Sequence, residues 1–250
     1  MEVNLDFYDS IVAFAERAKS LPRLDIVLLN AGLCPAKRVL NEQTNHDETI
    51  QVNYLSNALL VLLLLPAIKA TRPNQPGPTR ITFTSSEVAA WSKFNYEDGI
   101  SILETLDSPG KGSNTTSQMF TSKLLCQFFL VELAKRVPSS LAVINGASPG
   151  SVHDSQFNRE IDQTFSGAVV KRIMKYVVYT SADGARMMTD AIVNHGDETH
   201  GQFLSFRKLV PMAPIIYTKT GKKCGEQLWK ETIEELAFAK PERVLKFALD

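Results

Sequence analysis

A lysine stands at the head of a strongly apolar segment, TTSQMFTSKLLCQFFLVELAKRV, at positions 115–137. Ser122 precedes Lys123 directly, and Met119 lies four residues before it, one helical turn away. An ammonium at this spacing lowers the pKa of a neighbouring acid and so prepares it for proton transfer. The thioether of Met119 has no ionisable proton and cannot serve as such an acid.

Polar and small residues also follow three apolar runs that are typical of buried strands. These strand-end residues are Asn30, Ala31 and Gly32, then Ser85 and Ser86, then Pro149 and Gly150. Ligands of open parallel sheets bind at the carboxyl ends of the strands. We therefore expect these strand ends, together with Asn53 and Lys123 on the intervening helices, to surround one ligand.

The elements that must position these residues alternate between strand and helix. Continuous apolar runs predict strands at 24–30, 79–86, 140–150 and 202–206, and helical spacing predicts helices at 7–20, 44–70, 115–137, 180–196, 222–238 and 241–249. Apolar strands without polar alternation are typical of parallel sheets that are buried on both faces. The sequence therefore predicts an α/β fold, with helices on both faces of an open sheet, in a single domain over 1–250.

The composition excludes several classes of function. Lys plus Arg and Asp plus Glu both total 27, so the formal net charge is zero, and we expect neither a nucleic-acid nor a membrane partner. Cys34, Cys126 and Cys224 form no metal-ligand spacing with the four histidines, so we expect no metal site. The first residues do not resemble a signal peptide, and the apolar stretch at 58–68 is shorter than a membrane span, so we expect a cytoplasmic protein.

Five short motifs together resemble the short-chain dehydrogenase/reductase family. They occur in the family's order as LNAG (29–32), VNYLS (52–56), TFTSS (82–86), TSKLL (121–125) and SPGSV (148–152). The segment 87–114 is most similar to retinol-dehydrogenase-like members and to members from fungal specialised metabolism. The resemblance implies an incomplete Rossmann-like, doubly wound parallel sheet and an NADP cofactor.

The resemblance also implies catalytic roles for three residues. Ser86 would hydrogen-bond the substrate oxygen, Asn53 would fix a water that extends the proton path, and Lys123 would lower the pKa of a tyrosine and hold the cofactor ribose. Each residue also has a structural reading: a strand end for Ser86, a helix contact for Asn53, and a surface lysine for Lys123.

Further positions would contact the cofactor by the same resemblance. Asp6 would meet the adenine, Asn30 would lie near the adenosine ribose, and the backbone from Pro149 to Val152 would face the nicotinamide. A plain helix cap is an equal reading of Asp6.

Two features depart from the family pattern. Met119 occupies the tyrosine position, and Tyr96 lies in the preceding loop rather than on the helix. The family's glycine-rich TGxxxGxG turn, which grips the pyrophosphate, does not occur in the sequence. By analogy the first two strands of the family are missing, and we expect the stub EVNL (2–5) to pair with 24–30 or a partner chain to cover that edge. A lost gene start, a natural truncation and a structural remnant would each explain the departure.

The resemblance therefore implies an oxidoreductase that acts on a small alcohol or carbonyl, with doubtful redox competence. A non-redox enzyme, such as a cyclase, isomerase or dehydratase, is one alternative, and a non-catalytic partner of a full-length relative is another. Family members commonly associate through two long helices, so we expect a homo-oligomer through 44–70 and 115–137.

Overall fold

Five strands form one sheet, in the order β1-β2-β3-β4-β5, in a computed structural model that describes all residues except 109–113, 158, 164–177 and 250. The strands are β1 (Ile26–Leu29), β2 (Thr79–Thr84), β3 (Ala142–Ala147), β4 (Phe203–Ser205) and β5 (Lys208–Val210). The first four strands are parallel and β5 is antiparallel to β4. The predicted α/β fold with a parallel sheet is confirmed, whereas β1 is buried on one face only, with Val27 and Leu29 inside and Ile26 and Leu28 exposed.

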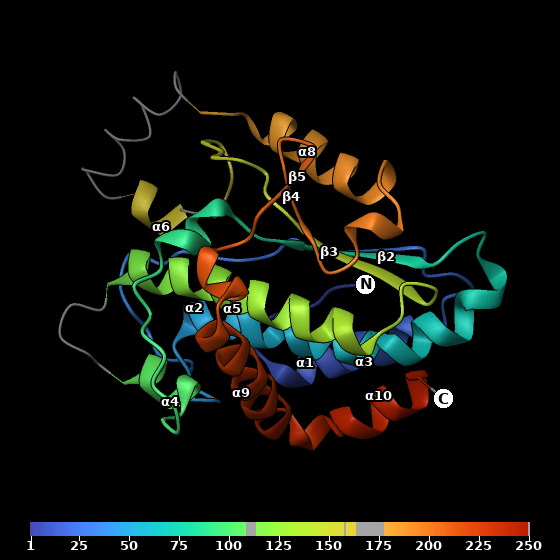
Figure 1. Cartoon of the computed structure of the whole chain (residues 1–250), viewed down its shortest axis with the longest axis horizontal. Coiled ribbons are helices and arrows are strands. Elements are labelled where there is room, and N and C mark those ends of the chain that lie inside the picture. The colour runs from blue at the N-terminus through green and yellow to red at the C-terminus, as the bar shows by residue number, and fades with distance from the viewer. Residues whose placement is uncertain (109–113, 158, 164–177, 250) are drawn as a thin grey trace.

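Helices cover both faces of this sheet (Figure 1). One face carries α1 (Tyr8–Ala18), α3 (Ser56–Thr71) and α5 (Thr115–Arg136), and the other carries α8 (Ser181–Val193) over β2 and β3. The shorter helices are α2 (Glu48–Ile50), α4 (Ile102–Asp107) and α6 (Arg159–Asp162). The four parallel strands follow one another across the sheet in chain order, and α3 and α5 connect them over one face while α8 connects β3 to β4 over the other, so the α8 crossover has the opposite hand to the first two.

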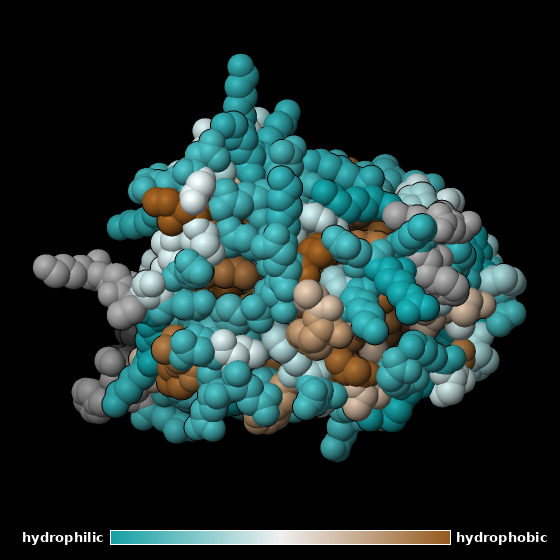
Figure 2. Space-filling view, turned by 90° about the horizontal axis from the view of Figure 1, so that it is seen from below, coloured by the Kyte–Doolittle hydropathy of each residue, from teal (hydrophilic) through white to brown (hydrophobic). Residues whose placement is uncertain are grey.

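Two C-terminal helices add an outer layer. Helix α9 (Lys219–Glu235) packs on α5, and α10 (Pro241–Leu249) packs on α3. Seen from the side of these helices, hydrophobic residues form separate small patches in a hydrophilic surface (Figure 2). Helices α3 and α5 are thus covered within one chain, and the homo-oligomer expected through 44–70 and 115–137 stays a prediction.

Helix α3 begins later than the sequence pattern predicts. The expected helix over 44–70 begins with α2, which Asp47 caps by accepting hydrogen bonds from the N–H groups of Thr49 and Ile50 at 3.0 and 3.4 Å, and α3 itself begins at Ser56. The Thr44 hydroxyl instead donates to Gln51 at 2.9 Å. The region Glu48–Asn74 has the length and composition of a membrane span, but 89% of its apolar window is buried, so it is a core helix here.

The N-terminal stub does not pair with β1, so the expected pairing is wrong, and cover of this edge by a partner chain stays a prediction. Residues 1–4 have no strand structure, and the Leu5 carbonyl accepts a hydrogen bond from the Ser56 hydroxyl at 2.5 Å, which ties the stub to α3 instead. Strand β1 is left at the edge of the sheet, with Ile26 and Leu28 49% and 40% exposed. A further strand of the sheet would pair with β1 at this edge.

Strand β5 was not predicted, because its turn carries no sequence signal. Phe206 and Arg207 connect β4 to β5 with φ of 47° and 62°. Two-residue turns of this kind favour glycine or asparagine, which accept a positive φ with little strain. Because a phenylalanine and an arginine occupy these positions, the sequence pattern does not indicate the hairpin.

Candidate active site

Asn53 lies in a π-helical turn, Gln51–Leu55, between α2 and α3. Turns of this kind often occur at functional sites, because the extra residue re-aims side chains. The Asn53 side chain accepts from the Leu33 N–H at 2.8 Å and donates to the Leu33 carbonyl at 3.0 Å. It also donates to the Ser122 hydroxyl at 3.1 Å. Asn53 therefore joins the loop after β1 to helix α5.

Lys123 follows Ser122 on α5, with only 7% of its surface exposed. Its ammonium donates to the Thr84 carbonyl, at the end of β2, at 2.8 Å. The Phe157 ring also lies over the ammonium, with 5.6 Å between Nζ and the ring centroid. Burial lowers the pKa of Lys123, because the charged form loses its hydration. The surface-lysine reading of Lys123 is therefore wrong.

Ser86 lies two residues beyond Thr84, at the same end of β2. Its hydroxyl accepts from the Val88 N–H at 3.3 Å and so caps the short 3-10 helix Glu87–Trp91. Its carbonyl accepts from the Gln127 amide of α5 at 3.4 Å. The structure therefore places Ser86 beside α5, while its hydroxyl is used within its own turn.

Met119 lies one turn before Lys123, and its backbone carbonyl accepts from the Ser122 hydroxyl at 2.8 Å. Among the described tyrosines, the side-chain partners lie outside the Asn53–Ser122–Lys123 cluster. These pairs are Tyr8 with Glu235, Tyr54 with Thr232, Tyr96 with Asp98 and Gln227, Tyr179 with Phe206, and Tyr217 with the Met212 N–H. In the described part of the chain, therefore, no phenol forms a hydrogen bond with this cluster.

The expected cofactor positions lie on separate loops. Asn30, after β1, accepts from the Thr84 hydroxyl at 3.1 Å and so belongs to the same end of the sheet as Lys123. Val152, after β3, forms an isolated parallel bridge with Tyr179. Asp6 lies in the turn before α1, where its carbonyl accepts from Asn41 at 2.9 Å. Asn30 therefore lies near Lys123, because both residues contact Thr84. Asp6 and Val152 contact other residues.

Four further residues take part in this site that pattern analysis did not assign. Ser122 and Thr84 connect Asn53 and Lys123 to one another and to β2. Phe157 lies in a segment without helical or strand periodicity, so nothing in the sequence places it over Lys123. Cys126, one turn after Ser122, donates to the Asn53 carbonyl at 3.2 Å, and burial raises its pKa to about 11, so it is an unreactive thiol.

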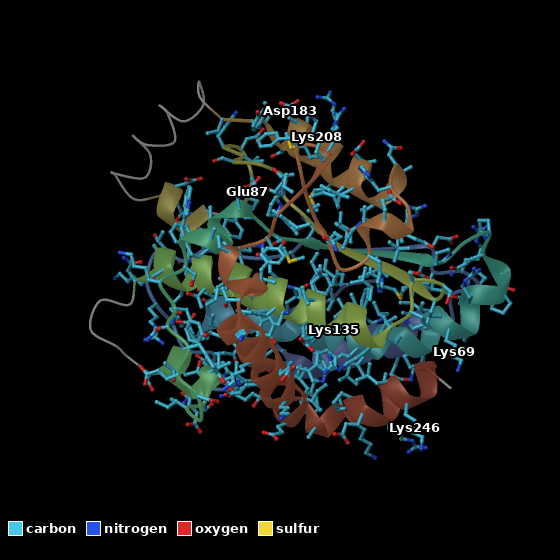
Figure 3. The ribbon with its side chains drawn as sticks, viewed as in Figure 1. Lys69, Glu87, Lys135, Asp183, Lys208 and Lys246 are labelled. Carbon is cyan, nitrogen blue, oxygen red and sulfur yellow. The ribbon has the colours of Figure 1, made fainter. Side chains whose placement is uncertain are left out.

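A carboxylate also lies at these strand ends. Glu87 accepts from the Ser148 hydroxyl, after β3, at 2.6 Å and from the Ser205 hydroxyl, in β4 (Figure 3). It thereby joins the turn after β2 to the next two strands. This arrangement fixes the rim of the sheet near Ser86, because both Glu87 oxygens accept from hydroxyls on neighbouring segments.

Replacing Gly32 with alanine is expected to destabilise the fold by about 1–3 kcal/mol, because an added Cβ overpacks the site. That Cβ would lie 2.9 Å from Asn53 Oδ1, which is held by the Leu33 N–H. Gly77→Ala is the matched control, since a Cβ there meets nothing within 4 Å, and its effect should stay within about 0.5 kcal/mol. Urea unfolding of both variants measures the difference, and equal losses would contradict close packing at Gly32.

Known proteins resemble this chain in structure and in sequence. No protein-family model matches the sequence. Among solved structures, an uncharacterized protein from Mycobacterium paratuberculosis is similar with a TM-score of 0.63 at 19% identity, over 95% of this chain and 75% of that one. The Pseudomonas aeruginosa RhlG/NADP active-site complex is similar with a TM-score of 0.55 at 18% identity, over 82% and 74% of the two chains. At these identities the likeness supports the fold.

Two relatives are similar at a higher level of identity. The short-chain dehydrogenase fogG of Aspergillus ruber is 39% identical over 241 residues, which cover 95% of this chain and 69% of the relative. The short chain dehydrogenase/reductase mfmJ of Annulohypoxylon moriforme is 37% identical over 243 residues, with the same coverage of 95% and 69%. This chain therefore belongs to the short-chain dehydrogenase/reductase family.

Proposed function

We propose that this protein is an oxidoreductase of fungal specialised metabolism that acts on a small alcohol or carbonyl compound with NADP. The observation that supports this most is the cluster of Asn53, Ser122 and Lys123 at the carboxyl end of β2. Buried polar groups that converge at the strand ends of a parallel sheet are the usual sign of a ligand site in such folds. The relatives that share this sequence are named as short-chain dehydrogenases.

The described residues fit one part of an NADP molecule. Lys123, which donates to the Thr84 carbonyl, would hold the nicotinamide ribose, Asn30, which accepts from the Thr84 hydroxyl, would lie near the adenosine ribose, and the backbone near Val152 would face the nicotinamide. The cofactor would supply or accept the hydride. The protein would supply a buried ammonium that polarises an adjacent oxygen, in a site where low solvent content strengthens the effect.

Pyrophosphate binding in such folds uses a glycine-rich turn at a helix N-terminus. The 250 residues of this sequence contain no TGxxxGxG turn. The fit to the cofactor therefore concerns its ribose and nicotinamide part, and binding is expected to be weaker than in a chain that carries that turn.

A non-redox role is the second candidate, as a cyclase, isomerase or dehydratase, or as a non-catalytic partner of a relative. Met119 favours it, because a thioether cannot protonate an alkoxide. In this case Lys123 and Ser86 would polarise a bound molecule without hydride transfer. We also propose a cytoplasmic location, with a small molecule as the partner.

Calorimetric titration with NADPH tests the redox function. We expect the native chain to bind NADPH, and Lys123→Met to weaken binding by about 10- to 100-fold, because a hydrogen bond from a charged donor is lost. Lys222→Met removes an exposed lysine of α9 and should leave the affinity unchanged. The absence of detectable binding at millimolar NADPH would remove the redox proposal and leave the non-redox candidate.

A further inference from the structure

His46 lies between two carboxylates that come from two different helices. Its Nδ1 lies 2.6 Å from Asp107 Oδ2, on the last residue of α4, and its Nε2 lies 3.2 Å from Glu235 Oε1, on the last residue of α9. An ionised carboxylate only accepts hydrogen bonds, whereas a neutral imidazole has a single N–H donor. The geometry therefore fits the imidazolium form of His46, in which both ring nitrogens carry a proton.

The backbone around His46 holds the ring in this place. The Asn41 N–H donates to the His46 carbonyl at 2.8 Å, and the Asn45 N–H donates to the Asn41 carbonyl at 2.9 Å. Asn45 closes this turn with a φ of 60°, a conformation that asparagine adopts more readily than most residues do. His46 is only 8% exposed, so the two carboxylates replace most of the water around its ring.

Other charged or titratable side chains near this cluster have partners of their own. The Tyr8 hydroxyl, from α1, donates to Glu235 Oε1 at 3.4 Å, and burial together with the charge of Glu235 raises the pKa of Tyr8, so this phenol stays neutral. Asp47, the next residue in the chain, pairs with Arg38 at 2.7 Å. The imidazolium is therefore matched by the carboxylates of Asp107 and Glu235.

These contacts make the charge of His46 depend on pH around and above neutrality. Burial by itself lowers the pKa of His46, but the hydrogen bonds and charges of Asp107 and Glu235 outweigh it and raise the pKa to about 9. A histidine pKa raised on folding stabilises the folded chain fully below the ordinary value of about 6.5, and this contribution is lost as the pH rises toward the folded value. The contacts of His46 therefore weaken between about pH 6.5 and pH 9.

The same cluster reaches the start of the helix run that carries Asn53. Asp107 uses its second oxygen, Oδ1, to accept from the Asp47 N–H at 2.8 Å, and Asp47 caps α2. Helix α4 lies beside α9 (Figure 1), and Glu231 of α9 holds its other end by accepting from two N–H groups in the first turn of α4 at 3.0 Å each. Loss of the imidazolium would therefore release one end of α4 while the other end stays bound.

We propose that His46 is a pH-sensitive latch, which in its charged form ties the ends of α4 and α9 to the loop before α2 and which opens when the imidazole loses its proton to the solvent. A neutral ring turns one lone pair toward a carboxylate, so one of the two contacts is lost. The start of the helix run then loses support from Asp107, so the latch makes the position of Asn53 depend on pH. This device does not depend on whether the chain transfers hydride.

Nuclear magnetic resonance of ¹⁵N-labelled imidazole rings tests the charge of His46 in the native chain. The chain has four histidines, and the signal that is missing from His46→Asn belongs to His46. We expect this ring to carry two protons at pH 7.5 and to titrate at least about one pH unit above the ordinary value of about 6.5. A titration midpoint at or below 6.5 would overturn the proposal.

Hydrogen exchange followed by mass spectrometry tests whether the latch opens. Between pH 6.5 and pH 8.5, after correction for faster chemical exchange, the protection of amides in α4 and in the last turns of α9 should fall by about tenfold or more in the native chain. His46→Asn keeps a donor toward Asp107 but has no titratable ring, so its protection should be low at both pH values. Equal falls in the native chain and His46→Asn would mean that other groups cause the change, and the latch would be ruled out.

Glu235→Gln serves for the same comparison if circular dichroism shows that His46→Asn does not fold. This variant keeps an oxygen for the Tyr8 hydroxyl and removes one of the two negative charges. We therefore expect the protection of α4 to fall less with pH than in the native chain. A fall as large as the native one would contradict a role for the Glu235 charge in the latch. Neither measurement uses NADPH, so its failure leaves the oxidoreductase proposal unaffected.

Discussion

Replacing Met119 with tyrosine is expected to accelerate NADPH-dependent carbonyl reduction by roughly 10²–10⁴-fold, the usual contribution of a positioned general acid. Residues four apart on a helix share one face, so the new hydroxyl would lie beside Lys123 on α5. The buried ammonium would lower the pKa of the phenol, because a nearby positive charge favours the ionised form. The backbone of Met119 already serves Ser122 and is unchanged by the substitution.

Met119→Phe is the matched control, because it has the ring of tyrosine without the hydroxyl. The decrease of NADPH absorbance with aromatic and aliphatic ketones measures the rate. Combining Met119→Tyr with Lys123→Met should abolish most of the gain, since the phenol then loses its charged neighbour. If Met119→Tyr binds NADPH and is no faster than Met119→Phe, the side chain at this position does not face the reacting carbonyl, and the non-redox candidate gains support.

The gathering of Asn53 and Lys123 could be predicted from the sequence, because it follows from topology. The helix that carries Asn53 follows β1, and the helix that carries Lys123 follows β2. In a parallel sheet both helices start from the carboxyl ends of the strands, so their N-terminal halves, which carry Asn53 and Lys123, lie near one another. The apolar runs that form these strands are unambiguous, which is why the fold itself could also be predicted.

The contacts that complete the site could not be predicted in this way. Phe157, which lies near Lys123, belongs to a segment without helical or strand periodicity. Its carbonyl accepts a hydrogen bond from the Cys34 N–H, and such a backbone contact cannot be predicted from the residue types. Ser86 matches a family motif, yet its hydroxyl caps the turn that follows it, because a serine at the start of a short helix satisfies a free N–H group. Motif matching identifies positions, whereas the local hydrogen bonds decide what each side chain does.

Asp47→Ala is expected to destabilise the protein by about 2–4 kcal/mol, because Arg38, whose side chain is 18% exposed, loses its carboxylate partner and keeps only backbone carbonyls as acceptors, while α2 loses its cap. Asp47 is 1% exposed and accepts from Arg38 Nε at 2.7 Å and from the Gln118 amide at 3.4 Å. It also caps α2, through the N–H groups of Thr49 and Ile50. The same change therefore loosens the start of the helix run that positions Asn53.

An exposed pair of the same residue types provides the control. Arg23 and Asp25 lie 2.6 Å apart, with side chains 52% and 40% exposed, and water screens such pairs, so Asp25→Ala should change the urea midpoint little. Asp47→Asn keeps an oxygen to cap α2 but removes the charge opposite Arg38, so it should fall between the native chain and Asp47→Ala. If Asp47→Ala and Asp25→Ala shift the midpoint equally, burial of the Arg38–Asp47 pair does not stabilise the helix start. If Asp47→Asn matches the native chain, capping rather than charge is the contribution of Asp47.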